Sequence, residues 1–258
     1  MREKKVPFLN ILINNLTMEE AIESVRRHLS EKRKMFVVYA NSDVIVKAEK
    51  DAKLRTAINS ADLVLADGMP LVWISRFYKR PLKERIAGSD MVPGICEMAW
   101  KEGYSLFLLG GQRGVPEAAA DNLTRLFPGI TIKGVYSPPM GFEKDQKEVE
   151  LIRKKVSDSG AEILIVCFGC PKQENFIYEN REYYGALVSV CAGATIDFLA
   201  GRIRRCPKWM AKAGLEWFYR FLKEPKRLFK RYFIDDMYIF YLALKYRFNS
   251  KENNIDAL

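Results

Sequence analysis

The sequence predicts an α/β fold in which helices cover both faces of a mostly parallel, Rossmann-like sheet. Two observations predict it: short segments that are apolar throughout recur along the chain, and longer segments of helical periodicity separate them. Strands of a parallel sheet are buried on both faces, so they have this continuous apolar character. The 258 residues are enough for one large α/β domain with a smaller segment attached. The predicted strands are residues 35–40, 63–66, 105–110, 130–135, 163–169 and 187–192.

Helices are predicted before the first strand and after each strand. Thr17 and Glu20 have the spacing of a capping box, so a helix is expected to begin at Met18. The segments after the strands carry apolar residues three and four positions apart, which is typical of helices that pack one face on a sheet. Helical connections of this kind join parallel strands. The predicted helices are residues 18–29, 43–59, 70–78, 90–101, 116–126, 147–157, 172–180 and 195–199.

The pattern changes after residue 200, and we expect an α/β core over residues 1–200 and a basic, aromatic, helical appendage over residues 201–258. No strand is predicted in the appendage. Residues 201–234 hold eleven Lys or Arg against two Glu, so they carry +9 of the formal net charge of +10. Pro207 is placed to open one helix and Pro225 a second that continues towards Arg247. Such a cationic segment is suited to phosphate, whether on a lipid surface, a nucleotide or a nucleic acid.

Histidine and cysteine usage excludes some chemistry. His28 is the only histidine and is expected on a solvated helix face, so Ser/His/Asp and Cys/His catalysis are excluded. Cys167 and Cys170 have the spacing of a metal or redox pair, but no second pair exists. Cys167 also lies in an apolar strand, which favours buried, reduced thiols over a zinc or redox site.

The sequence also predicts where the protein stays. Residues 1–7 are charged and lack the apolar core of a signal peptide, so export is not expected. The apolar run at 237–244 is far shorter than the ~20 residues that cross a bilayer. We therefore expect a cytoplasmic protein.

Asp67 is the first candidate for catalysis. It directly follows the predicted strand 63–66 and precedes a glycine, and ligands of open α/β sheets bind beyond the carboxyl ends of the strands. An ionised carboxylate there can accept a proton from an attacking hydroxyl group. The alternative is an Asp that caps the next helix, and the residues alone leave both interpretations open.

Other strand ends and loops give weaker candidates for ligand binding. The backbone of Gly110 and Gly111 could approach a nucleotide or a sugar, although a plain turn explains the pair equally well and the full glycine fingerprint is missing. Gln173 and Glu174 fall in a first helical turn, where they could bind sugar hydroxyls or simply be solvated. Arg85 could pair with an anion or with a nearby acid.

No D-x-D pattern follows a predicted strand, so the sequence lacks the usual carboxylates that hold a divalent ion on a nucleotide diphosphate. No metal and no other cofactor is predicted. Fixed cationic side chains can neutralise a departing diphosphate instead. Arg220, Arg227 and Lys230 of the appendage are the candidates for this role.

Taken together, the segments named below resemble the WecG/TagA/CpsF glycosyltransferases, glycosyltransferase family 26. The resemblance extends over about residues 9–248, and its specificity comes from the order of all the segments rather than from any one of them. The segments are Asn41 and residues 61–68, 84–90, 107–111, 171–174, 193–201, 207–210, 214–217 and 224–228.

The resemblance implies an inverting, metal-independent transfer of an N-acetylhexosamine-type sugar from a UDP-sugar, with N-acetylmannosamine or its uronate favoured over other sugars. The implied acceptor is a polyprenyl-diphosphate-linked sugar at the inner face of the membrane, in the synthesis of teichoic acid or another cell-surface polysaccharide. It also implies an anionic membrane surface as a partner and homo-oligomer formation. The roles that it implies are the base for Asp67, substrate contacts for Asn41, Arg85 and Gln173, and diphosphate contacts for Arg220, Arg227 and Lys230.

Two residues depart from the family pattern in places that concern the substrate. Tyr39 stands where relatives often have Thr, and Lys230 stands where Arg is common, which gives a point charge in place of a two-pronged donor. Two other functions are weighed against the transferase. One is a nucleotide-cofactor oxidoreductase, which would need the missing glycine fingerprint. The other is a nucleic-acid-binding protein, which the helical spacing of the appendage aromatics disfavours.

Overall fold

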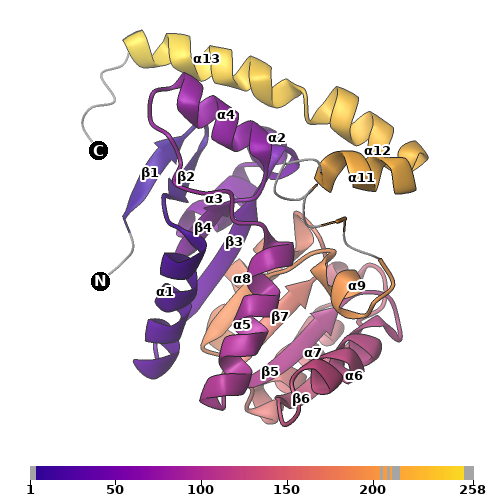
Figure 1. The fold of residues 1–258 in the computed structure, drawn as a ribbon. Helices are drawn as coiled ribbons and strands as arrows, with labels where there is room; N and C mark the ends of the chain where they lie inside the picture. The colour runs from indigo at the N-terminus through magenta and orange to yellow at the C-terminus, as the bar shows by residue number, and fades with distance from the viewer. Residues whose placement is uncertain (1–3, 204–205, 208–209, 211–215, 253–258) are drawn as a thin grey trace.

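Six parallel strands form the central sheet of the computed structural model, which describes residues 4–203, 206–207, 210 and 216–252 (Figure 1). The strands are β3 (Met35–Ala40), β4 (Leu63–Ala66), β5 (Ser105–Gly110), β6 (Thr131–Tyr136), β7 (Ile163–Cys167) and β8 (Val188–Cys191). Their spatial order is β4-β3-β8-β7-β5-β6, and every neighbouring pair is parallel. The predicted α/β class is therefore confirmed, with each predicted strand present.

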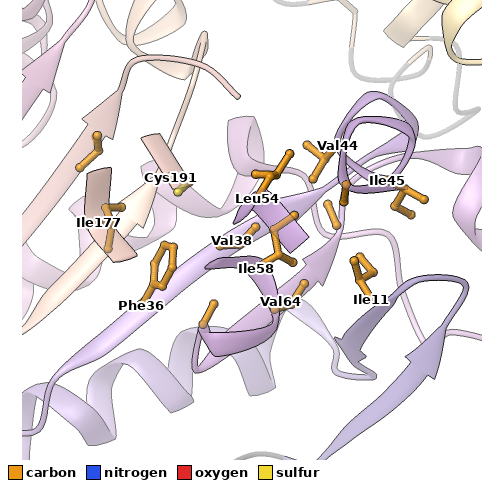
Figure 2. Packing of buried hydrophobic residues seen from close by; sticks show 14 of the residues in the cluster. Ile11, Phe36, Val38, Val44, Ile45, Leu54, Ile58, Val64, Ile177 and Cys191 are labelled. Carbon is orange, nitrogen blue, oxygen red and sulfur yellow. The ribbon is translucent and has the colours of Figure 1, made fainter. Parts of the chain in front are cut away.

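Both faces of the sheet are covered, as the apolar strands predicted. Along β3, Phe36 and Val38 enter one buried cluster, while Val37 and Tyr39 enter a second on the opposite face. Figure 2 shows part of the first cluster, where Phe36 and Val38 lie near Ile58. The first face is covered by α2 (Ser42–Lys50), α3 (Ala52–Ser60), α4 (Met69–Phe77), α7 (Gln146–Ser159) and α8 (Lys172–Asn180), and the second by α1 (Met18–Ser30), α5 (Gly88–Glu102), α6 (Val115–Leu126) and α9 (Thr195–Leu199).

The predicted capping box opens α1 as expected, but the single helix predicted over 43–59 is wrong. Asp51 has an extended backbone between α2 and α3, with φ −120° and ψ 99°. Its side chain accepts a hydrogen bond of 3.0 Å from the Leu54 backbone N–H and so caps α3. A short acidic side chain can bond to the backbone in this way, which favours a helix start over a helix interior.

An antiparallel hairpin that the sequence did not predict lies beside the sheet. It consists of β1 (Lys5–Phe8) and β2 (Ile11–Asn14). The Asn14 side-chain oxygen accepts a hydrogen bond of 2.8 Å from the Val64 backbone N–H, which joins the hairpin to β4. Because β4 is an edge strand of the central sheet, this contact satisfies a donor that the edge would otherwise expose.

His28, Cys96, Cys167 and Cys191 are buried, while Cys170 and Cys206 are partly buried. The expected solvated position of His28 is wrong: the residue is buried, and its Nδ1 lies 2.8 Å from the Ser24 carbonyl oxygen. Cys96 and Cys167 are buried free thiols, and burial raises the pKa of Cys96 to about 12. These thiols are therefore protonated at neutral pH. Within the described residues, no three His, Cys, Asp or Glu side chains gather closely enough to hold a metal ion.

The appendage is helical in its described part, but the long helix predicted from Pro225 is broken. A π-helical segment and a turn at residues 236–237 interrupt it. Of the helix predicted over residues 207–223, Pro207, Met210 and residues 216–223 are described, and residues 208–209 and 211–215 lie outside the described part. The elements are α11 (Glu216–Lys223), α12 (Pro225–Lys230), η3 (Arg231–Asp235) and α13 (Tyr238–Glu252).

Helix α13, which runs across α4 in Figure 1, contacts α2, and its Arg247 side chain donates a hydrogen bond to the Phe77 carbonyl oxygen at the end of α4. Its Ile239, Leu242 and Ala243 side chains are buried in the same cluster as the first face of the sheet. The Tyr78 hydroxyl donates a hydrogen bond of 2.6 Å to the Ala243 carbonyl oxygen. The division into a core of residues 1–200 and an appendage of residues 201–258 stays a prediction. Every helix in the described part of the chain is too short or too polar to span a membrane.

Candidate functional site at the carboxyl edge of the sheet

Asp67 stands at the carboxyl end of β4, next to the end of β3. Its backbone N–H donates a hydrogen bond of 2.8 Å to the Ala40 carbonyl oxygen. Gly68 follows with φ +154°, which favours glycine, and α4 begins without a side-chain cap. Asp67 therefore does not cap the helix that follows it, so the structure decides against that alternative.

Two groups from the following segment surround the Asp67 carboxylate. Its Oδ2 lies 3.5 Å from the backbone nitrogen of Gly88, the first residue of α5, and its Oδ1 lies 3.9 Å from an Arg85 guanidinium nitrogen. The Ile86 backbone N–H donates to the Ala66 carbonyl oxygen at 2.9 Å, which holds this segment beside β4. The Asp67 carboxylate therefore faces a helix N-terminus and a cation, and its side chain is 28% exposed. The group can thus meet a hydroxyl from solvent.

Asp90 is a member of this group that sequence reasoning did not single out. Its Oδ2 lies 3.2 Å from the second Arg85 guanidinium nitrogen, so Arg85 lies between two carboxylates. The only sequence signal was its place in the family segment 84–90. The predicted substrate contact of Arg85 stays a prediction, and the structure adds an ion pair with Asp67.

Asn41 begins α2 at the end of β3. Its side-chain oxygen accepts a hydrogen bond of 3.1 Å from the Val44 backbone N–H and so caps the helix. Asn41 also lies close to the turn after Asp67, because a Cβ atom added at Gly68 would be 3.9 Å from the Asn41 Cβ. The predicted substrate contact would therefore use the amide nitrogen of Asn41.

Gly110 and Gly111 have structural roles at the end of β5. A Cβ atom at Gly110 would lie 2.7 Å from the Cys167 carbonyl oxygen, and φ is +105°, so only glycine fits here. The Gly111 backbone N–H donates to the same Cys167 oxygen at 3.1 Å. The turn interpretation explains both residues, and their predicted role in ligand binding stays a prediction.

Gln173 joins the loops that follow β7 and β8. Its side-chain oxygen accepts hydrogen bonds from the Gly169 backbone N–H at 3.2 Å and from the Gly193 backbone N–H at 3.0 Å. Its amide nitrogen donates to Glu174 Oε1 at 2.9 Å. Both side chains are buried, so the solvated alternative for this first turn is wrong. The predicted substrate contact of Gln173 stays a prediction.

Lys47 connects the two groups of candidates. From α2, its ammonium lies 2.8 Å from Asp43 Oδ2 and donates to the Cys170 carbonyl oxygen at 3.2 Å. The helix that Asn41 opens is thereby held against the loop that leads to Gln173. Together with the strand order, this places the core candidates along one edge of the sheet.

The appendage candidates are placed only in part. Arg220 lies in α11 and Arg227 in α12, but their side chains are outside the described part of the structure. Lys230 ends α12 and is exposed. The next element, η3, contacts α2, so this end of the appendage reaches the helix that Asn41 opens.

Charged and amide side chains therefore follow the strands of a parallel sheet at its carboxyl edge, which is the edge where open α/β sheets bind their ligands. A sequence model of the glycosyl transferase WecG/TagA/CpsF family matches residues 6–253. The chain belongs to this family and is a glycosyltransferase. The resemblance is confirmed, and the oxidoreductase and nucleic-acid-binding alternatives are set aside.

Two relatives carry the same descriptive name, N-acetylglucosaminyldiphosphoundecaprenol N-acetyl-beta-D-mannosaminyltransferase. The protein from Bacillus spizizenii is 32% identical over 200 residues, which cover 78% of this chain and 76% of the relative. The protein from Bacillus subtilis is 30% identical over 223 residues, which cover 86% of this chain and 83% of the relative.

Proposed function

We propose that this glycosyltransferase moves an N-acetylmannosaminyl group, or its uronate, from a UDP-sugar to a polyprenyl-diphosphate-linked sugar. The names of both relatives support the sugar and the lipid acceptor. The observation that carries the mechanism is the partly exposed Asp67 carboxylate between Arg85 and the first residue of α5. Its product would enter teichoic acid or a related cell-surface polysaccharide.

The proposed reaction is a single displacement with inversion at the anomeric carbon. The acceptor hydroxyl oxygen forms the new bond to that carbon, while the bond between the carbon and the diphosphate oxygen breaks. UDP departs with the electron pair, and Asp67 takes the hydroxyl proton. Arg85 and the α5 N-terminus hold the carboxylate in place, which supplies the alignment that a weak base requires.

The departing diphosphate needs positive charge. In this proposal Arg220, Arg227 and Lys230 supply it, with Asn41, Gln173 and the backbone of Gly110 and Gly111 contacting the rest of the donor. The charge of +9 over residues 201–234 supports this assignment. Turnover is expected to survive EDTA, and a strict need for added Mg²⁺ or Mn²⁺ would contradict it.

The proposal places the enzyme on the cytoplasmic face of the membrane, with the appendage on an anionic lipid surface. Exposed lysines and large apolar side chains lie together in the appendage, as in segments that bind the lipid interface. Homo-oligomer formation stays a prediction. The exposed apolar residues are Trp217, Phe218, Leu222, Phe229, Phe233, Ile234, Met237, Tyr238, Tyr241, Leu244 and Phe248.

A donor screen tests this function. The full-length enzyme is incubated with a synthetic polyprenyl-diphosphate-GlcNAc acceptor and, separately, the UDP derivatives of N-acetylmannosamine, its uronate, N-acetylglucosamine and glucose. Mass spectrometry should detect acceptor enlarged by one N-acetylmannosaminyl or uronate unit. Transfer of only the other sugars would contradict the donor assignment, and no transfer to any lipid diphosphate would contradict the acceptor class.

A further inference from the structure

Glu174 is a buried acid that the proposed reaction does not use. The residue has 0% exposure, although it lies in the first turn of α8 at the carboxyl edge of the sheet. Its Oε2 is buried and has no hydrogen-bond partner among the described residues. Burial raises the pKa of Glu174, so the neutral carboxyl group is favoured. Such a group is costly to bury, which calls for a role.

Two neighbouring side chains interact with the Glu174 carboxyl group, the Gln173 amide and the Cys170 thiol. Glu174 Oε1 accepts from the Gln173 amide nitrogen at 2.9 Å, while the Gln173 oxygen accepts from the Gly169 and Gly193 backbone N–H groups at 3.2 and 3.0 Å. If the Gln173 amide were flipped, its NH₂ group would face the N–H groups of Gly169 and Gly193, and its oxygen would face Glu174 Oε1. The three bonds therefore select one orientation of the amide.

That orientation determines how two loops meet at the edge. Gly169 follows β7 and Gly193 follows β8, and both have positive φ, 76° and 52°. Neither loop donates this N–H to a strand; each donates to Gln173 instead. The amide nitrogen of Gln173 has one hydrogen left after the bond to Glu174, and this is the atom available for a ligand.

We propose that Glu174 is a positioning residue of the transferase site, which holds the Gln173 amide so that it joins the loops after β7 and β8. This role assumes one part of the proposed function, which is that Gln173 and the two loops hold the substrate. Glu174 itself contacts no substrate in this arrangement, because its side chain is buried beneath the edge.

Two substitutions separate this role from simple packing. Glu174→Gln matches the neutral acid in shape and keeps the oxygen that accepts from Gln173. Glu174→Met keeps the length and the apolar packing but removes that oxygen. With thermal unfolding within a few degrees of wild type, Glu174→Met should lower kcat/KM by about tenfold or more, because misplaced contacts are costly to the transition state. Glu174→Gln should stay within about threefold of wild type.

Equal kcat/KM values for Glu174→Met and wild type would overturn the proposal, as would equal losses in the Gln and Met variants. If Glu174→Met does not fold, Glu174→Leu takes its place with the same expected result. These variants use the donor and acceptor that wild type turns over best.

Amide hydrogen exchange provides a second measurement that does not depend on activity. The Gly169 and Gly193 amides should exchange about tenfold faster in Glu174→Met than in wild type, and at nearly the wild-type rate in Glu174→Gln. Unchanged exchange in the Met variant would overturn the proposal even if turnover fell. If wild type transfers no sugar at all, the proposed function fails, while this exchange contrast still tests the role of Glu174.

Discussion

At the residue scale, the Asp67 carboxylate lies beside Arg85 and the start of α5 and is partly exposed, so a hydroxyl group can reach it. Asp67→Asn keeps the size of the side chain but cannot take a proton. We expect kcat to fall about a hundredfold or more, because a positioned base contributes that much, while UDP binding measured by calorimetry stays near wild type. Asp121→Asn, an exposed change on α6, is the matched control. Turnover above about a tenth of wild type would remove Asp67 from the role of base.

Tyr39 gives a prediction about stability. Its hydroxyl is buried without a hydrogen-bond partner among the described residues, and burial raises its pKa, so it stays neutral. A buried donor without a partner costs about 1 kcal/mol or more. Tyr39→Phe should therefore be at least as stable as wild type, with Tm raised by roughly 2–4 °C for a domain of this size.

Tyr184→Phe is the matched control for Tyr39→Phe. The Tyr184 hydroxyl is also buried, but it lies 2.9 Å from the Ser189 hydroxyl in a hydrogen bond. Its loss should lower stability by about 1 kcal/mol. Both variants are compared by calorimetry, and a Tyr39→Phe protein that unfolds at a lower temperature than wild type would show that the hydroxyl has a stabilising partner.

At the scale of the element, the strands of the central sheet were easier to predict than the helix break at Asp51 and the N-terminal hairpin. A run such as residues 163–167 is apolar at each position because both sheet faces are covered, and that reason is visible in the sequence. At the break between α2 and α3, the Asp51 side chain accepts a hydrogen bond from the Leu54 backbone N–H, and at the end of the hairpin the Asn14 side chain accepts one from the Val64 backbone N–H. Such choices depend on tertiary neighbours, so a periodic pattern does not reveal them.

In the candidate site as well, positions at strand ends could be predicted from the sequence, but contacts between distant segments could not. Asp67 could be found because it follows a strand, but its pairing with Arg85 depends on a segment that returns along the end of β4. The burial of Glu174 was hidden for a similar reason, since an acid in a first helical turn is solvated in most settings. The Glu174 side chain is buried because of its packing against Gln173, which the local sequence does not reveal.

The packing of α13 on the core is expected to depend on pH, because it includes contacts with the Glu49 carboxylate. Glu49 accepts from Lys245 at 2.8 Å and from the Tyr246 hydroxyl at 2.9 Å. Burial alone would raise the pKa of Glu49, but the hydrogen bonds from Lys245 and Tyr246 outweigh it and lower the pKa. A carboxyl group with a lowered pKa stabilises the folded state above its unfolded pKa, and this contribution is lost as the pH falls through the folded value.

Protection of the α13 amides against exchange should therefore decrease as the pH falls below about 4, the ordinary pKa of Glu. Glu49→Gln should show weaker protection at neutral pH and lose this acid dependence. Glu179→Gln, which removes an exposed ion pair with Lys53 away from α13, is the control and should behave as wild type. Equal acid dependence in the Glu49→Gln protein would show that another group holds the helix.

At the scale of the whole molecule, the chain joins a nearly neutral α/β core to a strongly cationic end. Helix α13 buries part of this end in the main apolar cluster, so deletion after Gly201 would expose core residues as well as remove charge. Loss of activity on deletion would therefore have two causes. Substitution of exposed lysines in the intact chain isolates the charge.

Lys223, Lys226 and Lys230 are exposed on α11 and α12 and suit this test. Each lysine near an anionic surface contributes about 1 kcal/mol, so changing all three to Gln should weaken binding to phosphatidylglycerol-containing vesicles on the order of a hundredfold at low salt. Binding is measured by co-sedimentation, with neutral phosphatidylcholine vesicles for comparison.

The control changes three exposed lysines outside the appendage, Lys144, Lys147 and Lys154 in and just before α7, to Gln and so alters the net charge equally. If the appendage is the lipid-binding surface, this control protein should keep most of its vesicle binding, because screened charges act only within about a Debye length of the membrane. Equal losses in the two triple variants would show that net charge, and not the place of the cations on α11 and α12, brings the enzyme to the membrane.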